Sequence, residues 1–130
     1  MLTNPAALDC EPKALAPMLI ELPPGALYDY QMRYDASSDV RYTSLHDDDS
    51  RVDVAKVKAV AEQVHSLLGL RDLSRVDIVV GRDGEPQVLE AAVTPGLTET
   101  STFPLAVTSA GLELSDVYAT LVSNAKKRGG

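Results

Sequence analysis

The most regular pattern of apolar and polar positions lies near the middle of the chain, over residues 50–68. Apolar side chains recur there every three or four positions, at Val57, Val60, Ala61, Val64, Leu67 and Leu68. This spacing predicts a helix with one apolar face. We expect Ser50 to cap its start and Gly69 to end it in a left-handed conformation.

Polar residues near this helix could carry chemistry of their own. Three aspartates at 47–49 precede it, where the helix dipole favours negative charge, and they lack the spacing of a calcium-binding loop. His65 lies one turn after Glu62 and could act as an acid or a base. We expect instead a partly exposed surface histidine, because no second histidine or cysteine is spaced to form a metal pair with it.

Two segments before the helix have the composition of strands. Residues 14–22 predict a buried strand, whose start Pro17 confines to an edge or a bulge. Residues 27–34 predict a second strand with its tyrosines on one face. The Pro-Pro-Gly sequence at 23–25 predicts a turn between them. We expect residues 1–13 to lack regular structure and residues 35–49 to form a polar loop.

A hairpin is predicted after the helix. Residues 74–81 alternate between polar and apolar side chains, and residues 85–92 return after a favoured two-residue turn, Asp83-Gly84. This turn sets a register in which Ile78 faces Leu89. We expect both of these residues to belong to the core.

The same register places two carboxylates opposite each other. Asp77 would face Glu90, with Cβ atoms about 5 Å apart, and Arg75 would face Ala92 on the same side of the hairpin. Two like charges at this distance need a positive partner. Three interpretations stay open: a divalent cation between the acids, a pair that shares one proton, or a structural ion-pair cluster neutralised by Arg75.

The C-terminal third combines a loop with two helices. Residues 93–102 are rich in Thr, Pro, Gly and Ser, and such a loop is either an ordinary turn or a group of donors for an anion. Pro104 suits the first turn of a short helix that ends at Gly111. We expect Ser115 to cap a last helix, with basic residues at its C-terminal end.

These elements predict one α+β domain over residues 1–130. An antiparallel sheet would carry the 50–68 helix and the C-terminal helices on one face. Besides the two hairpin residues named above, we expect Val60, Val64 and Leu121 in the core.

The composition limits the kinds of molecule that this protein is expected to bind. With 19 acidic and 12 basic residues, the net charge is −7, which argues against a general nucleic-acid binder. A single cysteine excludes a disulfide framework within the chain. No secretory signal and no apolar stretch of about 20 residues is found, so we expect a cytoplasmic protein without a membrane partner.

Several short motifs together resemble a known family. Ser-Arg-Val-Asp at 74–77, Val-Leu-Glu at 88–90 and Thr-Pro-Gly-Leu-Thr-Glu-Thr-Ser at 94–101 are similar to the C-terminal part of D-alanine–D-alanine ligases, which are ATP-grasp enzymes. The resemblance extends from about Leu19 to Val122. It implies an antiparallel sheet with flanking helices, as in the C-terminal half of an ATP-grasp domain.

The resemblance also implies a metal and a catalytic residue. Asp77 and Glu90 correspond to magnesium ligands, and Arg75 to the residue that binds the acyl phosphate and stabilises charge during transfer. The family has a third ligand, asparagine, two residues after the glutamate. This chain has Ala92 there, so the resemblance implies weak magnesium binding.

Four further residues correspond to substrate-binding positions. Gly96 would lie beside the oxyanion, and Ser101 would hold a substrate carboxylate. Arg33 stands where the family has a phosphate-binding lysine, and Tyr34 follows it on a loop over the site.

Three functions follow from this resemblance and from the short chain. The domain could retain a site for an amino acid or another carboxylate without being a complete ATP-dependent ligase. It could be half of a split carboxylate–amine ligase, with ATP bound only if a partner chain supplies the other half. It could also be a non-catalytic interaction module. Each implies a small-molecule ligand, a homodimer or a partner subunit.

Overall fold

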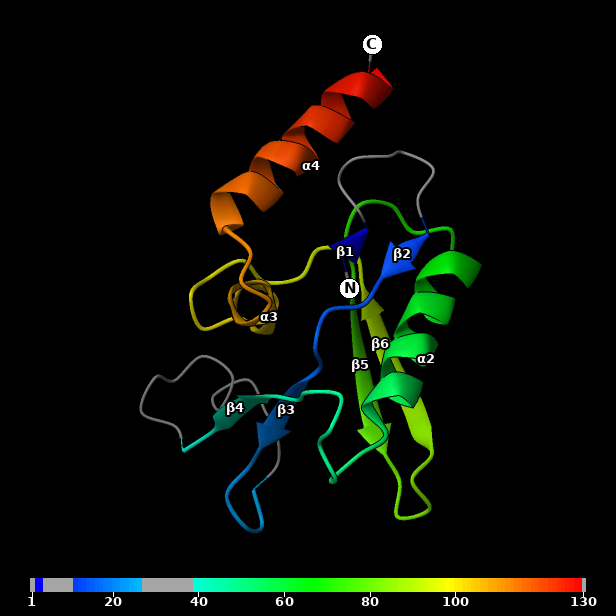
Figure 1. Ribbon diagram of the computed structural model, residues 1–130, viewed down its shortest axis with the longest axis vertical. Coiled ribbons are helices and arrows are strands. Elements are labelled where there is room, and N and C mark those ends of the chain that lie inside the picture. Colours follow the sequence, from blue (N-terminus) through cyan, green and yellow to red (C-terminus); the bar gives the residue numbers. More distant parts are fainter. Residues whose placement is uncertain (1, 4–10, 27–38, 130) are drawn as a thin grey trace.

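The computed structural model describes residues 2–3, 11–26 and 39–129 (Figure 1). The predicted strand over 27–34, with Arg33 and Tyr34, lies outside these residues. In chain order, the elements are β1 (Leu2–Thr3), β2 (Pro12–Lys13), β3 (Met18–Glu21), β4 (Arg41–Ser44), α2 (Val54–Leu67), β5 (Arg75–Val80), β6 (Pro86–Ala92), α3 (Thr102–Ser109) and α4 (Leu114–Gly129). None of the helices among the described residues is long and apolar enough to span a bilayer.

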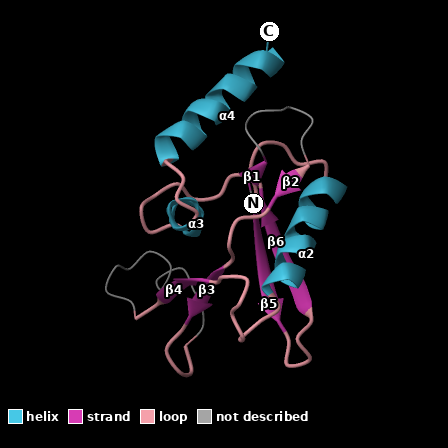
Figure 2. Cartoon of the chain, in the orientation of Figure 1, coloured by secondary structure: helices cyan, strands magenta, loops and turns pink. Residues whose placement is uncertain are grey.

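The α+β class and the antiparallel pairing of strands are confirmed. The described strands nevertheless form three two-stranded ribbons, β1–β2, β3–β4 and β5–β6, rather than one continuous sheet (Figure 2). The helices are divided between them: α2 packs on β2 and the β5–β6 hairpin, and α3 packs on β3, β4 and α4. The prediction that all helices cover one sheet face is therefore wrong.

The paired strands β1, β2 and β4 fall in segments predicted to lack strands. β4 contains a single apolar side chain, Tyr42, in the sequence Arg-Tyr-Thr-Ser, so its pattern gives little strand signal. Its partner decides its conformation, because β3 pairs with it from Met18 opposite Ser44 to Glu21 opposite Arg41.

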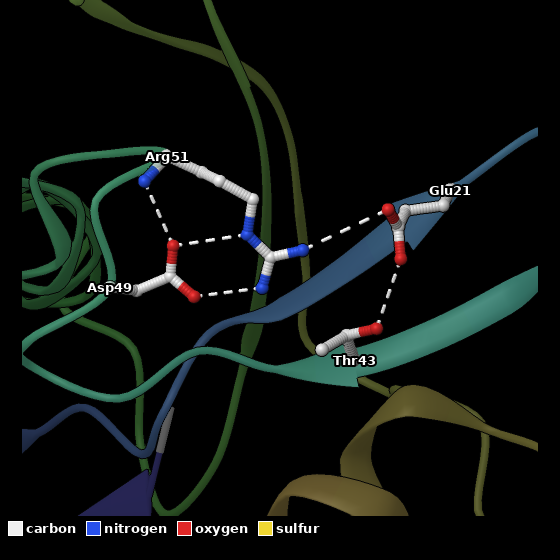
Figure 3. Close-up of polar contacts among 4 residues, drawn as sticks. All are labelled: Glu21, Thr43, Asp49 and Arg51. Atoms are coloured by element: carbon white, nitrogen blue, oxygen red, sulfur yellow. Dashed lines mark hydrogen bonds and ion pairs between the residues drawn. The ribbon is translucent and has the colours of Figure 1, made fainter.

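A polar network ties this ribbon to the segment before α2 (Figure 3). The Arg51 guanidinium donates to both carboxylate oxygens of Asp49, at 3.0 and 2.7 Å, and its other nitrogen lies 3.8 Å from Glu21. Glu21 in turn accepts a hydrogen bond from Thr43 across the ribbon. The hydrogen bonds from Arg51 lower the pKa of Asp49 to about 2. Two of the aspartates before the helix thus bind basic side chains, Asp49 with Arg51 and Asp47 with Lys58.

The central helix has the predicted end but not the predicted start. Asp53, rather than Ser50, is its N-cap, because the Asp53 carboxylate accepts a hydrogen bond from the Lys56 backbone amide at 2.9 Å. Gly69 ends the helix with φ +60°, as predicted. The Leu70 amide then donates to a carbonyl of the last turn, which satisfies one of the exposed helix-end acceptors.

His65 is buried rather than partly exposed. It is 2% exposed, and its Nδ1 lies 2.8 Å from the hydroxyl oxygen of Ser74, which is fully buried. Because His65 stands four residues after Ala61, it belongs to the apolar side of α2. Burial lowers the pKa of the imidazole, and a backbone hydrogen bond at Leu70 and the charge of Asp72 offset only part of this shift.

A cluster of buried apolar residues lies among the C-terminal helices. Phe103 and Val107 of α3 and Val117 of α4 form the buried cluster, and partly buried apolar residues surround it: Leu15, Leu73, Leu114, Tyr118 and Leu121. Leu89 was expected in the core but is 67% exposed. Ile78, Val60, Val64 and Leu121 are half-buried.

One ion pair holds the far end of α4 against the start of the hairpin. Arg128 donates to both carboxylate oxygens of Asp72, which lowers the pKa of that carboxyl. Asp72 has φ +60°, an uncommon conformation for a residue other than glycine. The last helix begins at Leu114, one residue before Ser115. Ser115 therefore lies inside the helix and is not its N-cap.

Candidate functional site

The hairpin that carries the candidate site has a longer turn than the sequence predicts. The Gly81 amide donates to the Glu85 carbonyl at 3.0 Å, and the Gly84 amide donates to the Gly81 carbonyl at 3.0 Å. Three residues, 82–84, therefore form the loop, instead of Asp83-Gly84 alone. Gly84 adopts φ +80°, a conformation that glycine reaches without a steric penalty.

A β-bulge compensates for this extra turn residue. Near the turn, Ile78 faces Val88 rather than Leu89, so the predicted register is wrong there by one residue. The register shifts between Asp77 and Ile78, and Leu89 is the additional residue of β6. Beyond the bulge, Asp77 faces Glu90 as predicted.

An arginine on the same face of the hairpin binds one member of the carboxylate pair. Arg75 donates through Nε to Asp77 Oδ1 at 2.7 Å and through Nη2 to Asp77 Oδ2 at 2.9 Å. The Arg75 side chain is 17% exposed and that of Asp77 is 38% exposed, so water only partly screens this bidentate pair. Glu90 lies opposite Asp77 and is exposed.

The loop after β6 brings two predicted substrate-binding residues into contact. A Cβ atom on Gly96 would lie 2.6 Å from the Ser101 hydroxyl oxygen, so only glycine allows this approach without a shift. The Ser101 hydroxyl lies 2.7 Å from that of Thr98, and the Ser101 amide donates to the Thr98 carbonyl at 2.8 Å. Ser101 is also the N-cap position of α3, where its side chain makes no capping bond.

The sequence analysis missed one hydrogen-bonded pair, His65 and Ser74, that positions the hairpin. Ser74 immediately precedes Arg75, and its bond to His65 fixes the start of β5 against α2. The burial of His65 could have been predicted, because this residue falls on the apolar side of the helical repeat. Arg33 and Tyr34 lie outside the described residues.

The comparison with known families assigns this domain to the C-terminal part of an ATP-grasp ligase. The family described as D-ala D-ala ligase C-terminus matches residues 6–123, and the chain belongs to this family.

Its relatives are D-alanine–D-alanine ligases. The enzyme of Pelotomaculum thermopropionicum is 33% identical over 120 residues, which cover 92% of this chain and 37% of the relative. That of Anaeromyxobacter dehalogenans is 35% identical over 118 residues, or 88% of this chain and 36% of the relative. The structure of D-alanyl-alanine synthetase A from Vibrio cholerae matches with a TM-score of 0.67 at 27% identity, over 85% of this chain and 33% of that one. The chain thus spans just over a third of the length of these curated relatives.

The family uses ATP and Mg²⁺, so the described residues can be tested for a fit to the metal. Asp77 and Glu90 would supply carboxylate oxygens, but both oxygens of Asp77 already accept bonds from Arg75. Position 92, on the same face, holds only a methyl group. Within the described part of the chain, no group of three His, Cys, Asp or Glu side chains could hold a metal. These residues do not fit a resident magnesium ion.

Proposed function

We propose that this chain retains a binding site for an amino acid or a related carboxylate and is not by itself a complete ATP-dependent ligase. The observation that carries the proposal is the Asp77–Glu90 pair, with Arg75 bonded to Asp77 on the same face of the hairpin. Two opposed carboxylates are destabilising unless a positive group lies beside them. Arg75 supplies one such group, and an ammonium ligand would supply another.

Each end of an amino acid would find a complementary group. Exposed Glu90 would accept hydrogen bonds from the ammonium group. The loop from Val93, which continues directly from β6, offers the Thr98 and Ser101 hydroxyls for the carboxylate. Charge-assisted hydrogen bonds of this kind are roughly twice as strong as neutral ones, so a small ligand can be held by few contacts.

ATP chemistry would require groups that the described residues do not bring together. No magnesium-type donor set is present among them, and the curated relatives extend well beyond the matched region. We therefore expect the purified chain, given ATP, Mg²⁺ and D-alanine, to form no dipeptide unless a second polypeptide completes the site. Dipeptide formation by the chain alone would contradict this part of the proposal.

The binding site is tested by calorimetric titration with D-alanine and with D-alanyl-D-alanine. Glu90→Gln removes the charge at constant shape, and we expect it to weaken binding by at least about tenfold, or roughly 1.4 kcal/mol. The matched control is Glu113→Gln, which makes the same exchange at an exposed position next to α4. If Glu90→Gln binds as well as the wild type, Glu90 is not part of the site. If the wild type binds neither compound, the proposed function is wrong.

A second candidate function is that of an interaction module, including one half of a split ligase. Large apolar side chains on the hairpin and the following loop are exposed: Val79, Val88, Leu89, Val93 and Leu97. Val79 and Val88 belong to neighbouring register pairs, so both faces of the hairpin carry exposed apolar groups, and such groups commonly mark an interface.

We expect the chain to self-associate or to bind a partner subunit through exposed apolar residues of the hairpin such as Leu89. Leu89→Glu should lower the mass measured by light scattering at micromolar concentration, because a carboxylate at 67% exposure disrupts an apolar contact. Val122→Glu, at an exposed position of α4, is the control and should leave the mass unchanged. A monomeric wild type that captures no partner would refute the interaction module.

A further inference from the structure

Position 92 lies where a third ligand of the carboxylate face would stand. Residues two apart on a strand point to the same side, so Ala92 shares the face of Glu90. In the register it lies directly opposite Arg75 and diagonal to Asp77. A side chain with an oxygen at this position would reach the space between the strands, but the alanine methyl group offers no donor.

The remaining donors are poorly placed to retain a divalent cation. A metal would have to compete with Arg75 for both oxygens of Asp77. It would then hold only the exposed carboxylate of Glu90 outright. Magnesium dehydrates reluctantly and is bound through one or two carboxylates only when other anionic oxygens, such as phosphates, complete its shell.

We propose that Ala92 makes this site independent of divalent metal: the guanidinium of Arg75 neutralises Asp77, and residue 92 is the determinant that withholds a metal from the pair. This inference rests on the proposed function and deepens it: the carboxylate ligand would be bound by hydrogen bonds and ion pairs, without a metal ion. It would distinguish this chain from the metal-using members of its family.

The experiment restores the missing donor and measures metal binding directly. Ala92→Asn adds an amide oxygen on the face of Asp77 and Glu90, whereas Ala91→Asn adds the same group at the neighbouring position, which pairs with Val76 on the other face. Mn²⁺ alone is titrated into the full chain and followed by electron paramagnetic resonance. We expect Ala92→Asn to bind Mn²⁺ at least about tenfold more tightly than the wild type, because affinity rises with the number of oxygen ligands. Ala91→Asn should bind like the wild type.

A double variant tests whether the gain in Mn²⁺ affinity comes from this site. Adding Glu90→Gln to Ala92→Asn should abolish the gain, and circular dichroism should show that each variant is folded. If Ala92→Asn is not folded, Ala92→Asp makes the same test with a carboxylate donor. Wild-type binding as tight as that of the Asn variant, or an equal gain in Ala91→Asn, would overturn the proposal.

The same titrations separate this inference from the proposed function. D-Alanyl-D-alanine should bind the wild type equally well in EDTA and in millimolar Mg²⁺. A requirement for Mg²⁺ would overturn metal independence while supporting the binding site. If neither D-alanine nor D-alanyl-D-alanine binds in either buffer, the proposed function is wrong, and the Mn²⁺ titration still decides the role of position 92.

Discussion

Replacing Phe103 with alanine is expected to lower the free energy of unfolding by about 3–5 kcal/mol, as is usual for a large buried aromatic residue. Phe103 is 4% exposed, is the only phenylalanine of the chain and packs with Val107 and Val117 where α3 meets α4. Removing the ring leaves a cavity that these two helices cannot close without losing their contacts with each other. Because the free energy of unfolding of a small domain is only about 5–15 kcal/mol, this one substitution would remove a large part of it.

Guanidinium denaturation followed by circular dichroism measures this effect. Leu112→Ala is the control, because Leu112 is a large apolar residue that is exposed, and it should cost less than about 1 kcal/mol. If Phe103→Ala is unfolded in buffer, Phe103→Leu keeps the comparison possible, with an expected cost of about 1–2 kcal/mol. A cost for Phe103→Ala no larger than that of Leu112→Ala would show that the core lies elsewhere.

The second large effect is a loss of stability in weak acid caused by His65. Burial lowers the pKa of His65 in the folded chain below its ordinary value of 6.5. The unfolded chain therefore binds the proton more readily, and the free energy of unfolding falls as the pH falls through about 6.5 toward the folded pKa. Among the described residues, the buried Nε2 of His65 has no hydrogen-bond partner.

Two substitutions test this expectation. His65→Asn removes the titrating group and keeps a polar atom near Ser74, so the fall in unfolding free energy between pH 7 and pH 5 should shrink. His46→Asn, at the exposed histidine, should leave that fall unchanged. Ser74→Ala should cost about 1–3 kcal/mol at pH 7, because it leaves the buried Nδ1 without its partner. An identical pH dependence in His65→Asn and the wild type would exclude His65 as the cause.

Part of the candidate site could be predicted from sequence because it depends on neighbours along the chain. The opposition of Asp77 and Glu90 was predicted correctly, although by a route with two compensating differences. The turn has one residue more than expected, and the bulge at Leu89 restores the register. A hairpin is a local structure, so an error at its turn can be corrected only within the same two strands.

Side-chain contacts within the site could not be obtained in this way, even between residues that are close in the chain. In the structure Arg75 forms a bidentate ion pair with Asp77. The sequence had left open whether a divalent cation, a shared proton or Arg75 would relieve the repulsion between the two acids. The approach of Gly96 to Ser101 depends on the path of the loop between them. It follows from the Thr98–Ser101 hydrogen bonds, which spacing alone does not reveal.

Sequence patterns were sufficient to predict the α+β class, the central helix with its glycine end, the hairpin and the family motifs. Each of these rests on periodicity or on residues close together in the chain. Tertiary contacts were needed to establish that His65 is buried, that β4 is a strand, that Leu89 is exposed and that the core lies around Phe103. Burial and strand pairing each depend on two surfaces that meet, and a pattern in one segment describes only one of them. A repeat shows which side of an element is apolar, but the element that covers that side comes from elsewhere in the chain.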